Sequence, residues 1–153
     1  VFEYQLGIAR ELNLPVIIHA RESLEVIFTS LKKYPYLKGI FHCFSGDINQ
    51  AEQAIDRGFL LGIGGVVTFK NTQLDKVLLK TGLFSLVLET DSPYLAPVPY
   101  RGKRNESSYI PLIAQKIADI LQEDIKKIEK ITTQNAMNLF TLHPENASNR
   151  QYE

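Results

Sequence analysis

The sequence has little of what marks several protein classes. Its one cysteine, Cys43, excludes an internal disulfide framework and suits a reducing cytosol. No apolar run approaches the roughly 18 residues that a membrane-spanning helix needs. Neither sign of charge is in excess, because 17 basic residues balance 17 acidic ones, so we expect at most a local basic patch. We therefore expect a cytoplasmic protein that does not contact a membrane.

Common catalytic and nucleotide-binding motifs are also missing. Gly62, Gly64 and Gly65 lie outside any G-x-G-x-x-G or P-loop frame, so a turn or tight packing is the default interpretation. Ser45 has no G-x-S-x-G elbow around it, which argues against a serine hydrolase. Cys43 lies between two aromatic rings, and we expect a buried, inert thiol.

What the sequence does contain is an alternation of short apolar runs and amphipathic stretches. Its 153 residues suffice for one domain, which we take as residues 1–153, with a polar tail from about residue 143. The runs rich in β-branched residues predict strands, and the 3.6-residue periodicities predict helices. The predicted strands are 16–19, 38–44, 59–65 and 85–91; the predicted helices are 2–13, 23–33, 49–57, 72–80 and 110–121, with one or two more between 125 and 140.

This order predicts an α/β fold with a parallel sheet that is covered on both faces. An open doubly wound sheet and part of a TIM-type (β/α)8 barrel both fit. A full barrel takes about 200 residues or more, so four strand–helix units would be about half of one. The first helical stretch has neither a capping residue nor an initiator methionine ahead of Val1. We therefore expect this sequence to be part of a longer chain.

Three predicted strands end in residues that suit metal chemistry. The first ends at His19, the second carries His42, and the fourth ends at Glu89 and Asp91. The carboxyl ends of parallel strands meet at one edge, where both architectures build active sites. A single histidine there is more often structural, but two imidazoles and a carboxylate together could bind a divalent metal and leave positions open for water and substrate.

Two of these carboxylates raise a question of charge. Glu89 and Asp91 are two residues apart, so in a strand they would point to the same side and repel one another unless a cation lies near. The alternative is that Glu89 orients a histidine through its ring N–H.

A cluster of positive charges follows the fourth strand. Arg101, Lys103 and Arg104 lie in its outgoing loop, and Arg21 follows the first strand. Such residues usually belong to a solvated loop, but beside a metal they could bind phosphate groups.

Taken together, five motifs resemble the TatD family of metal-dependent deoxyribonucleases. They occur in the order and spacing of that family and cover the chain to about Phe140. The motifs are LPVIIHARE (14–22), GIFHCFSGD (39–47), LGIGGVVTFKN (61–71), LETDSPYLAPVPYRGKRNE (88–106) and ITTQNAMNLF (131–140).

The resemblance implies a (β/α)8 barrel with one or two divalent ions, Mg, Mn or Zn, at the carboxyl ends of its strands. His19 and His42 match the two single-histidine ligands of the family. Asp91 matches the acidic residue that binds metal and accepts a proton from the attacking water. The family cleaves phosphodiester bonds of DNA, some members from the 3′ end, so DNA, or RNA, is the expected partner.

The sequence also departs from the family pattern. It has no counterpart of the His-x-His pair on the first strand or of the glutamate that ends the fourth, and both would precede Val1. The resemblance therefore places these four strands as the fifth to eighth of the barrel, completed by a missing N-terminal half or a covering partner. Two other functions remain open: hydrolysis of a small amide, lactone or other ester, and an inactive truncated fragment.

Overall fold

The four strands form one parallel sheet in sequence order. In the computed structural model, which describes residues 1–142, the sheet order is β1-β2-β3-β4 and all three strand pairs are parallel. The strands are β1 (Val16–His19), β2 (Gly39–His42), β3 (Phe59–Ile63) and β4 (Leu86–Leu88). The predicted parallel α/β architecture is therefore confirmed. The predicted polar tail lies outside the described residues.

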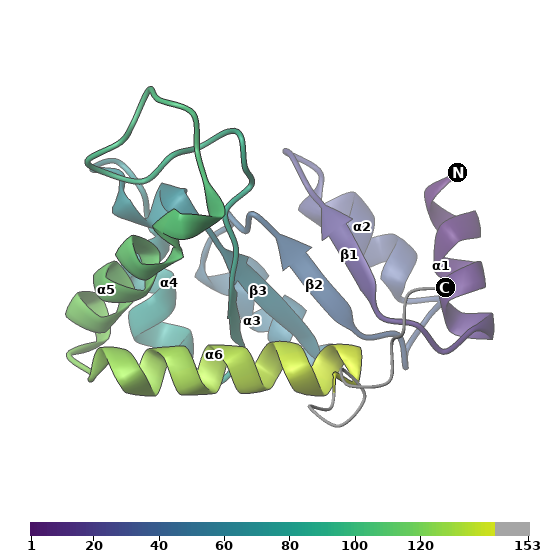
Figure 1. The fold of residues 1–153 in the computed structure, drawn as a ribbon. Coiled ribbons are helices and arrows are strands. Elements are labelled where there is room, and N and C mark those ends of the chain that lie inside the picture. The colour runs from purple at the N-terminus through teal and green to yellow at the C-terminus, as the bar shows by residue number, and fades with distance from the viewer. Residues whose placement is uncertain (143–153) are drawn as a thin grey trace, which may run out of the picture.

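Helices lie on both sides of the sheet but cover mainly one of its faces (Figure 1). The helices α2, α3 and α4 lie on one face, and α6 crosses the amino ends of the strands on the other. The helical elements are α1 (Phe2–Glu11), α2 (Leu24–Leu31), α3 (Ile48–Asp56), η1 (Gly65–Thr68), α4 (Leu74–Thr81), η2 (Ser107–Tyr109), α5 (Ile110–Leu121) and α6 (Ile125–Phe140). None of the helices in residues 1–142 combines the length and apolar character needed to cross a membrane.

The hydrophobic core lies between the sheet and the helices of its covered face. Strands β2 and β3 are buried along most of their length, and Phe41 and Leu61 are at most 1% exposed. Phe41 lies between Phe28 of α2 and Phe59 of β3, with ring centroids 5.3 and 5.2 Å away and the rings tilted by 57° and 49°. This burial follows from the apolar character of the strand runs, as a parallel sheet requires.

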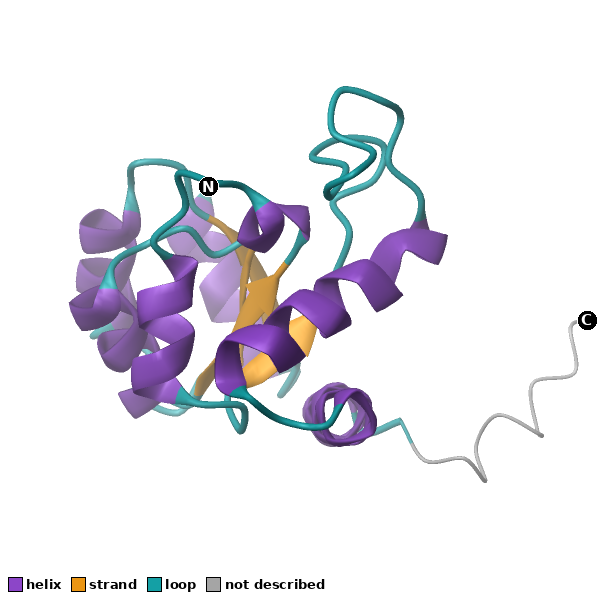
Figure 2. Ribbon diagram, turned by 90° about the vertical axis from the view of Figure 1, so that its left-hand side faces the viewer, coloured by secondary structure: helices purple, strands orange, loops and turns teal. Residues whose placement is uncertain are grey.

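The opposite face of β1 is not covered by the described chain. Ile17, which lies between the buried Ile18 and the half-buried Val16, is 63% exposed. No described strand pairs with the outer edge of β1 or with that of β4. The view from the side shows that the helices gather mainly on one side of the strands (Figure 2).

Three strands end earlier than the sequence predicted, and each ends for a local reason. Strand β2 stops at His42 because Cys43 has φ 48°, and η1 replaces the end of the third predicted strand. Strand β4 stops at Leu88, so Glu89 and Asp91 are not in a strand, and Asp91 has φ 54°. The premise that both carboxylates point the same way along a strand is therefore wrong.

The long connection after β4 packs closely on η1. We call residues 89–105 the strap. A Cβ built on Gly65 would lie 2.1 Å from the carbonyl oxygen of Leu95, a distance that real Cβ atoms do not reach. Thr68 adds a polar contact, since its hydroxyl accepts a hydrogen bond from the backbone N–H of Val98 at 2.9 Å. The strap is thus held against the end of β3, beside the carboxyl ends of the strands.

Replacing Gly65 by alanine should therefore destabilise the chain. We expect Gly65→Ala to lower the free energy of unfolding by about 1–3 kcal/mol, because either the strap or η1 must move. Gly7→Ala is the matched control, because nothing lies within 4 Å of its added Cβ in helix α1 and alanine is the better helix former. Urea unfolding followed by circular dichroism would measure both; an unchanged Gly65→Ala variant would contradict the close contact.

Candidate metal-binding site at the carboxyl ends of the strands

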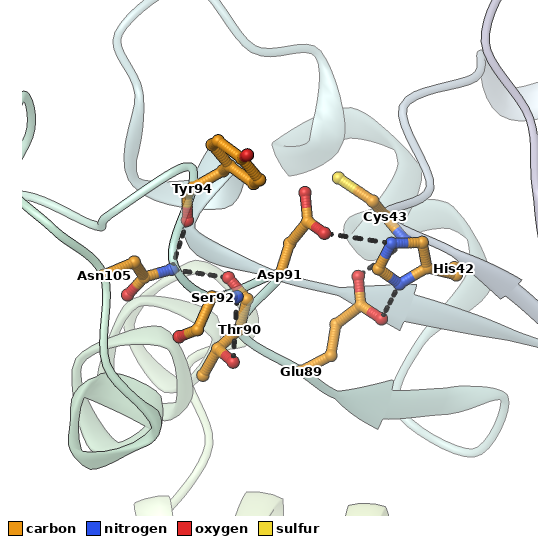
Figure 3. A network of polar contacts seen from close by, with 8 residues as sticks. All are labelled: His42, Cys43, Glu89, Thr90, Asp91, Ser92, Tyr94 and Asn105. Atoms are coloured by element: carbon orange, nitrogen blue, oxygen red, sulfur yellow. Dashed lines mark hydrogen bonds and ion pairs between the residues drawn. The ribbon is translucent and has the colours of Figure 1, made fainter.

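His42 and two carboxylates form the centre of a polar cluster at the end of β2 (Figure 3). Nδ1 of His42 lies 2.5 Å from Oε2 of Glu89, and Nε2 of His42 lies 3.3 Å from Oδ1 of Asp91. The three side chains are between 18% and 29% exposed. The site is thus partly shielded, yet still open to solvent.

Glu89 is held by two contacts with neighbouring residues of β2 and its loop. Besides His42, it accepts a hydrogen bond at Oε1 from the backbone N–H of Cys43, at 2.6 Å. The carboxylate therefore bridges a side chain and the backbone, which fixes the plane of the His42 ring. Since an ionised carboxylate can only accept, the Nδ1 of His42 donates to it.

Glycines in β3 and after it leave room for this carboxylate. A Cβ built on Gly62 would lie 3.0 Å from Oε2 of Glu89, and one on Gly64 would lie 3.6 Å from Oε1. Gly62 lies beside His42 in the sheet, because Phe41 pairs with Leu61 one residue earlier. A side chain at Gly62 would occupy the space through which Glu89 reaches His42. The sequence alone predicts only a turn or tight packing for Gly62 and Gly64.

The other ring nitrogen of His42 faces Asp91. With Nδ1 donating to Glu89, a neutral ring presents the lone pair of Nε2 to Asp91, whose oxygen also carries lone pairs. Two ligand atoms each about 2.1 Å from a metal at angles of 90–109° are about 3.0–3.4 Å apart. The separation of 3.3 Å fits two neighbouring ligands of one cation. A carboxylate on the far nitrogen is the usual support of a metal-binding histidine.

His19 lies next to His42 but outside this cluster. The two residues pair in register, and their ring centroids are 5.8 Å apart at 37°. Across residues 1–142, no group of three or more His, Cys, Asp or Glu side chains is placed so that it could hold a metal. The structure thus brings His42 and Asp91 together, whereas the predicted set of His19, His42 and Asp91 is not assembled.

The predicted phosphate-binding residues are exposed around the same end of the sheet. Arg21, Arg101, Lys103 and Arg104 all lie on the surface. The guanidinium of Arg101 lies over the ring of Phe69, 4.4 Å from its centroid, and the ammonium of Lys103 is 6.0 Å from the ring centroid of Tyr100. Both cations belong to the strap, and within residues 1–142 they contact aromatic rings rather than carboxylates.

One buried polar residue in this region was missed from the sequence. Asn105 is 2% exposed and donates hydrogen bonds to the carbonyl oxygens of Thr90 and Tyr94. It follows three basic residues, so it resembles an ordinary polar loop residue. Only its place at the end of a Pro-rich segment, within a motif of the family, could have drawn attention to it.

A polar centre of this kind on a parallel α/β sheet is typical of metal-dependent hydrolases, and comparison with known proteins agrees. The family model for TatD-related DNases matches residues 1–141. The chain belongs to this family.

Curated relatives carry broader names than the family. The "uncharacterized metal-dependent hydrolase YabD" of Bacillus subtilis is 42% identical over 146 residues, which cover 94% of this chain and 57% of the relative. YcfH of Escherichia coli, with the same description, is 37% identical and is matched over 54% of its length. The chain thus spans little more than half the length of these relatives.

Solved structures support the fold. The TatD homologue YjjV of Escherichia coli superposes with a TM-score of 0.85 at 29% identity, over 91% of this chain and 54% of that one. A TatD-family hydrolase of Entamoeba histolytica gives a TM-score of 0.80 at 22% identity, and this likeness supports only the fold.

The half-buried Cys43 borders the two carboxylates and should react slowly. Burial, followed by the nearby charges of Glu89 and Asp91, raises the pKa of its thiol to about 11. The predicted inert thiol is consistent with this environment. At pH 8 the thiolate is therefore scarce, and we expect alkylation by iodoacetamide to be about 100-fold slower than for an ordinary cysteine with a pKa near 9.

The alkylation rate should rise with pH up to about 11, because the reactive thiolate forms only there. Mass spectrometry of quenched samples would measure it. In strong denaturant the rate should return to that of a free thiol, which separates the effect of the fold from that of the local sequence. A rapid reaction of the folded chain at pH 7 would contradict the assignment.

Proposed function

We propose that the protein carrying this chain is a metal-dependent phosphodiesterase that cleaves DNA, with RNA as an alternative substrate. The observation that carries the proposal is the pair of Nε2 of His42 and Oδ1 of Asp91, 3.3 Å apart and backed by Glu89. Both atoms are ligands suited to Mn²⁺ or Zn²⁺, and Asp91 also to Mg²⁺. A cation bound there would lower the pKa of a coordinated water and offset charge on a phosphate.

Each residue of the site has a proposed role. His42 and Asp91 hold the cation, and His19 contributes from the adjacent strand end. Glu89 keeps the His42 ring oriented through the short contact to Nδ1. Asp91 accepts a proton from the attacking water, for which its partly exposed carboxylate is accessible.

The basic residues supply the proposed contact to the nucleic-acid backbone. Arg101, Lys103 and Arg104 lie exposed in the strap, and Arg21 follows β1. Arginine can bind phosphate oxygens in a two-point manner, and lysine acts as a point charge. Because the net charge of the chain is zero, these contacts suit a local grip on a strand end rather than long tracking along a duplex. Cleavage from a strand end is the corresponding mode, and the family resemblance suggests the 3′ end.

We also propose that these four strands are the fifth to eighth of a (β/α)8 barrel. The open edges of β1 and β4 and the 63% exposed Ile17 are the surfaces that further strands would cover. The chain matches 54–57% of the length of the relatives and neighbours named above, which agrees with part of a barrel. In this proposal the remaining half of the barrel supplies the other metal ligands. We also propose that the protein acts in the cytoplasm.

A second candidate is hydrolysis of a small amide, lactone or other ester. The names of the relatives YabD and YcfH, metal-dependent hydrolases without a stated substrate, are compatible with it. The third candidate is that these 153 residues are inactive on their own. It is favoured because residues 1–142 bring only His42 and Asp91 together as metal ligands. Activity towards DNA ends and a panel of small esters, measured with the same preparation, would separate these functions.

Removing the charge of Asp91 tests the proposed site. We expect Asp91→Asn to weaken Mn²⁺ binding at least about tenfold, because a charged ligand is lost. In the complete protein, cleavage of 3′-labelled single-stranded DNA should fall by about 100-fold or more, the contribution of a general base. Calorimetry and gel electrophoresis would measure the two effects.

The matched control for this substitution is Asp119→Asn. Asp119 is exposed on α5, and the asparagine side chain can still accept the hydrogen bond that Gln115 donates. This variant should keep full affinity and activity. Full activity of Asp91→Asn would refute the proposed mechanism.

The open face of the sheet can be tested with a complementary segment. The chain should form a one-to-one complex with the part of YabD that lies outside the matched region, and Ile17→Lys should abolish it. Val26→Lys, at an exposed site on α2, should leave the complex intact. Sedimentation velocity would detect the complex; equal binding by both variants would exclude this face.

A further inference from the structure

Asn105 closes the strap around Asp91. Its Nδ2 atom donates to the carbonyl oxygens of Thr90 and Tyr94, at 2.5 and 2.6 Å, and its backbone N–H donates to the carbonyl of Pro93 at 3.0 Å. The bonds therefore join the end of the strap to residues on both sides of Asp91. Figure 3 shows the amide between these two carbonyl groups.

This burial sets Asn105 apart from the other polar side chains. Within residues 1–142, Asn105 and Thr132 are the buried polar residues, and Thr132 bonds only to carbonyls of its own helix α6. Asn105 instead spans 15 and 11 residues of sequence to reach its acceptors. Its remaining acceptor, Oδ1, receives the backbone N–H of Glu106 at 2.9 Å. The side chain is fully used in tying the strap.

Asp91 needs such a support because its backbone conformation is unfavourable. Its φ of 54° is in the left-handed region, which costs energy for a residue with a Cβ atom. A further bond from the N–H of Tyr94 to the carbonyl of Asp91, at 2.9 Å, closes the same turn. If the carbonyls of Thr90 and Tyr94 lost their shared donor, the turn could relax and carry the carboxylate away from His42.

Asparagine has the chemistry that this position requires. One amide nitrogen offers two N–H groups, which serve two carbonyl oxygens at once. Aspartate has the same shape but would present an oxygen to both carbonyls, serine could donate to only one, and alanine to neither. A buried carbonyl without a donor is unfavourable, so each substitution should loosen the turn to a different degree.

We propose that Asn105 is a positioning residue that sets the distance between the Asp91 carboxylate and Nε2 of His42, and through it the affinity for a divalent cation. The second part rests on the proposed function, whereas the first concerns only the strap. Neither the basic residues nor the strand ends supply this support.

Hydrogen exchange tests the first part. In Asn105→Asp, the amide of Tyr94 should exchange at least tenfold faster than in the wild type, while amides of β2 and β3 keep their rates. The exchange rate of the Tyr94 amide in Asn105→Ser should lie between the rates of the wild type and Asn105→Asp. This variant replaces Asn105→Asp if that one does not fold. Asn13→Asp is the control: it makes the same chemical change at an exposed residue that also has positive φ. Unchanged exchange at Tyr94, or equal acceleration throughout the chain, would overturn the proposal.

A double-mutant cycle tests the second part, with Mn²⁺ affinity measured by calorimetry. Asn105→Ser should weaken binding about tenfold, the effect typical of residues that orient a ligand, but should cause no further loss in an Asp91→Asn background. Independent effects of the two substitutions would overturn the positioning role. If Asp91→Asn alone leaves Mn²⁺ affinity unchanged, the proposed cation site fails, and hydrogen exchange decides the role of Asn105.

Discussion

The arrangement of the site depends on one carboxylate. Glu89 receives Nδ1 of His42 on one oxygen and the backbone N–H of Cys43 on the other. It thereby connects the end of β4 to the end of β2 across β3, whose Gly62 leaves the space for the contact. With the ring fixed from one side, its other nitrogen can face only one direction. That direction is the one from which Asp91 approaches, so the placement of both proposed ligands follows from Glu89.

The sequence predicted the fold because its signals were local and redundant. The strand runs are short, apolar and followed by amphipathic helices, which allows few arrangements besides a parallel sheet. The continuous burial of β2 and β3, which includes Phe41 and Leu61, then follows directly from their apolar runs. The ends of the strands were less predictable, since they depend on backbone conformations such as the positive φ of Cys43 and Asp91. Positive φ is uncommon for any residue other than glycine, and although aspartate adopts it more often than most, its presence in a sequence does not predict it.

For the site, too, the sequence predicted which residues take part but not how they contact one another. His19, His42, Glu89 and Asp91 could be proposed because parallel strands deliver their carboxyl ends to one edge. Which of them touch could not be deduced, because the contacts join residues 46 and 47 positions apart through side-chain geometry. Asn105 was missed for the same reason, as its burial depends on how the strap folds back on η1. Family resemblance identified the residues, but the structure identified how they support one another.

The contact between α6 and β4 has a consequence for the order in which the chain becomes structured. Asn135 donates from α6 to the carbonyl of Leu86, 49 residues earlier, at 2.8 Å. During synthesis, strands β1 to β3 and the helices between them emerge well before this helix and can pack early. Strand β4 and the strap with Asp91 receive their last support only when α6 has left the ribosome. A nascent chain would therefore bring the backbone of His42 into the sheet before Glu89 and Asp91 reach it.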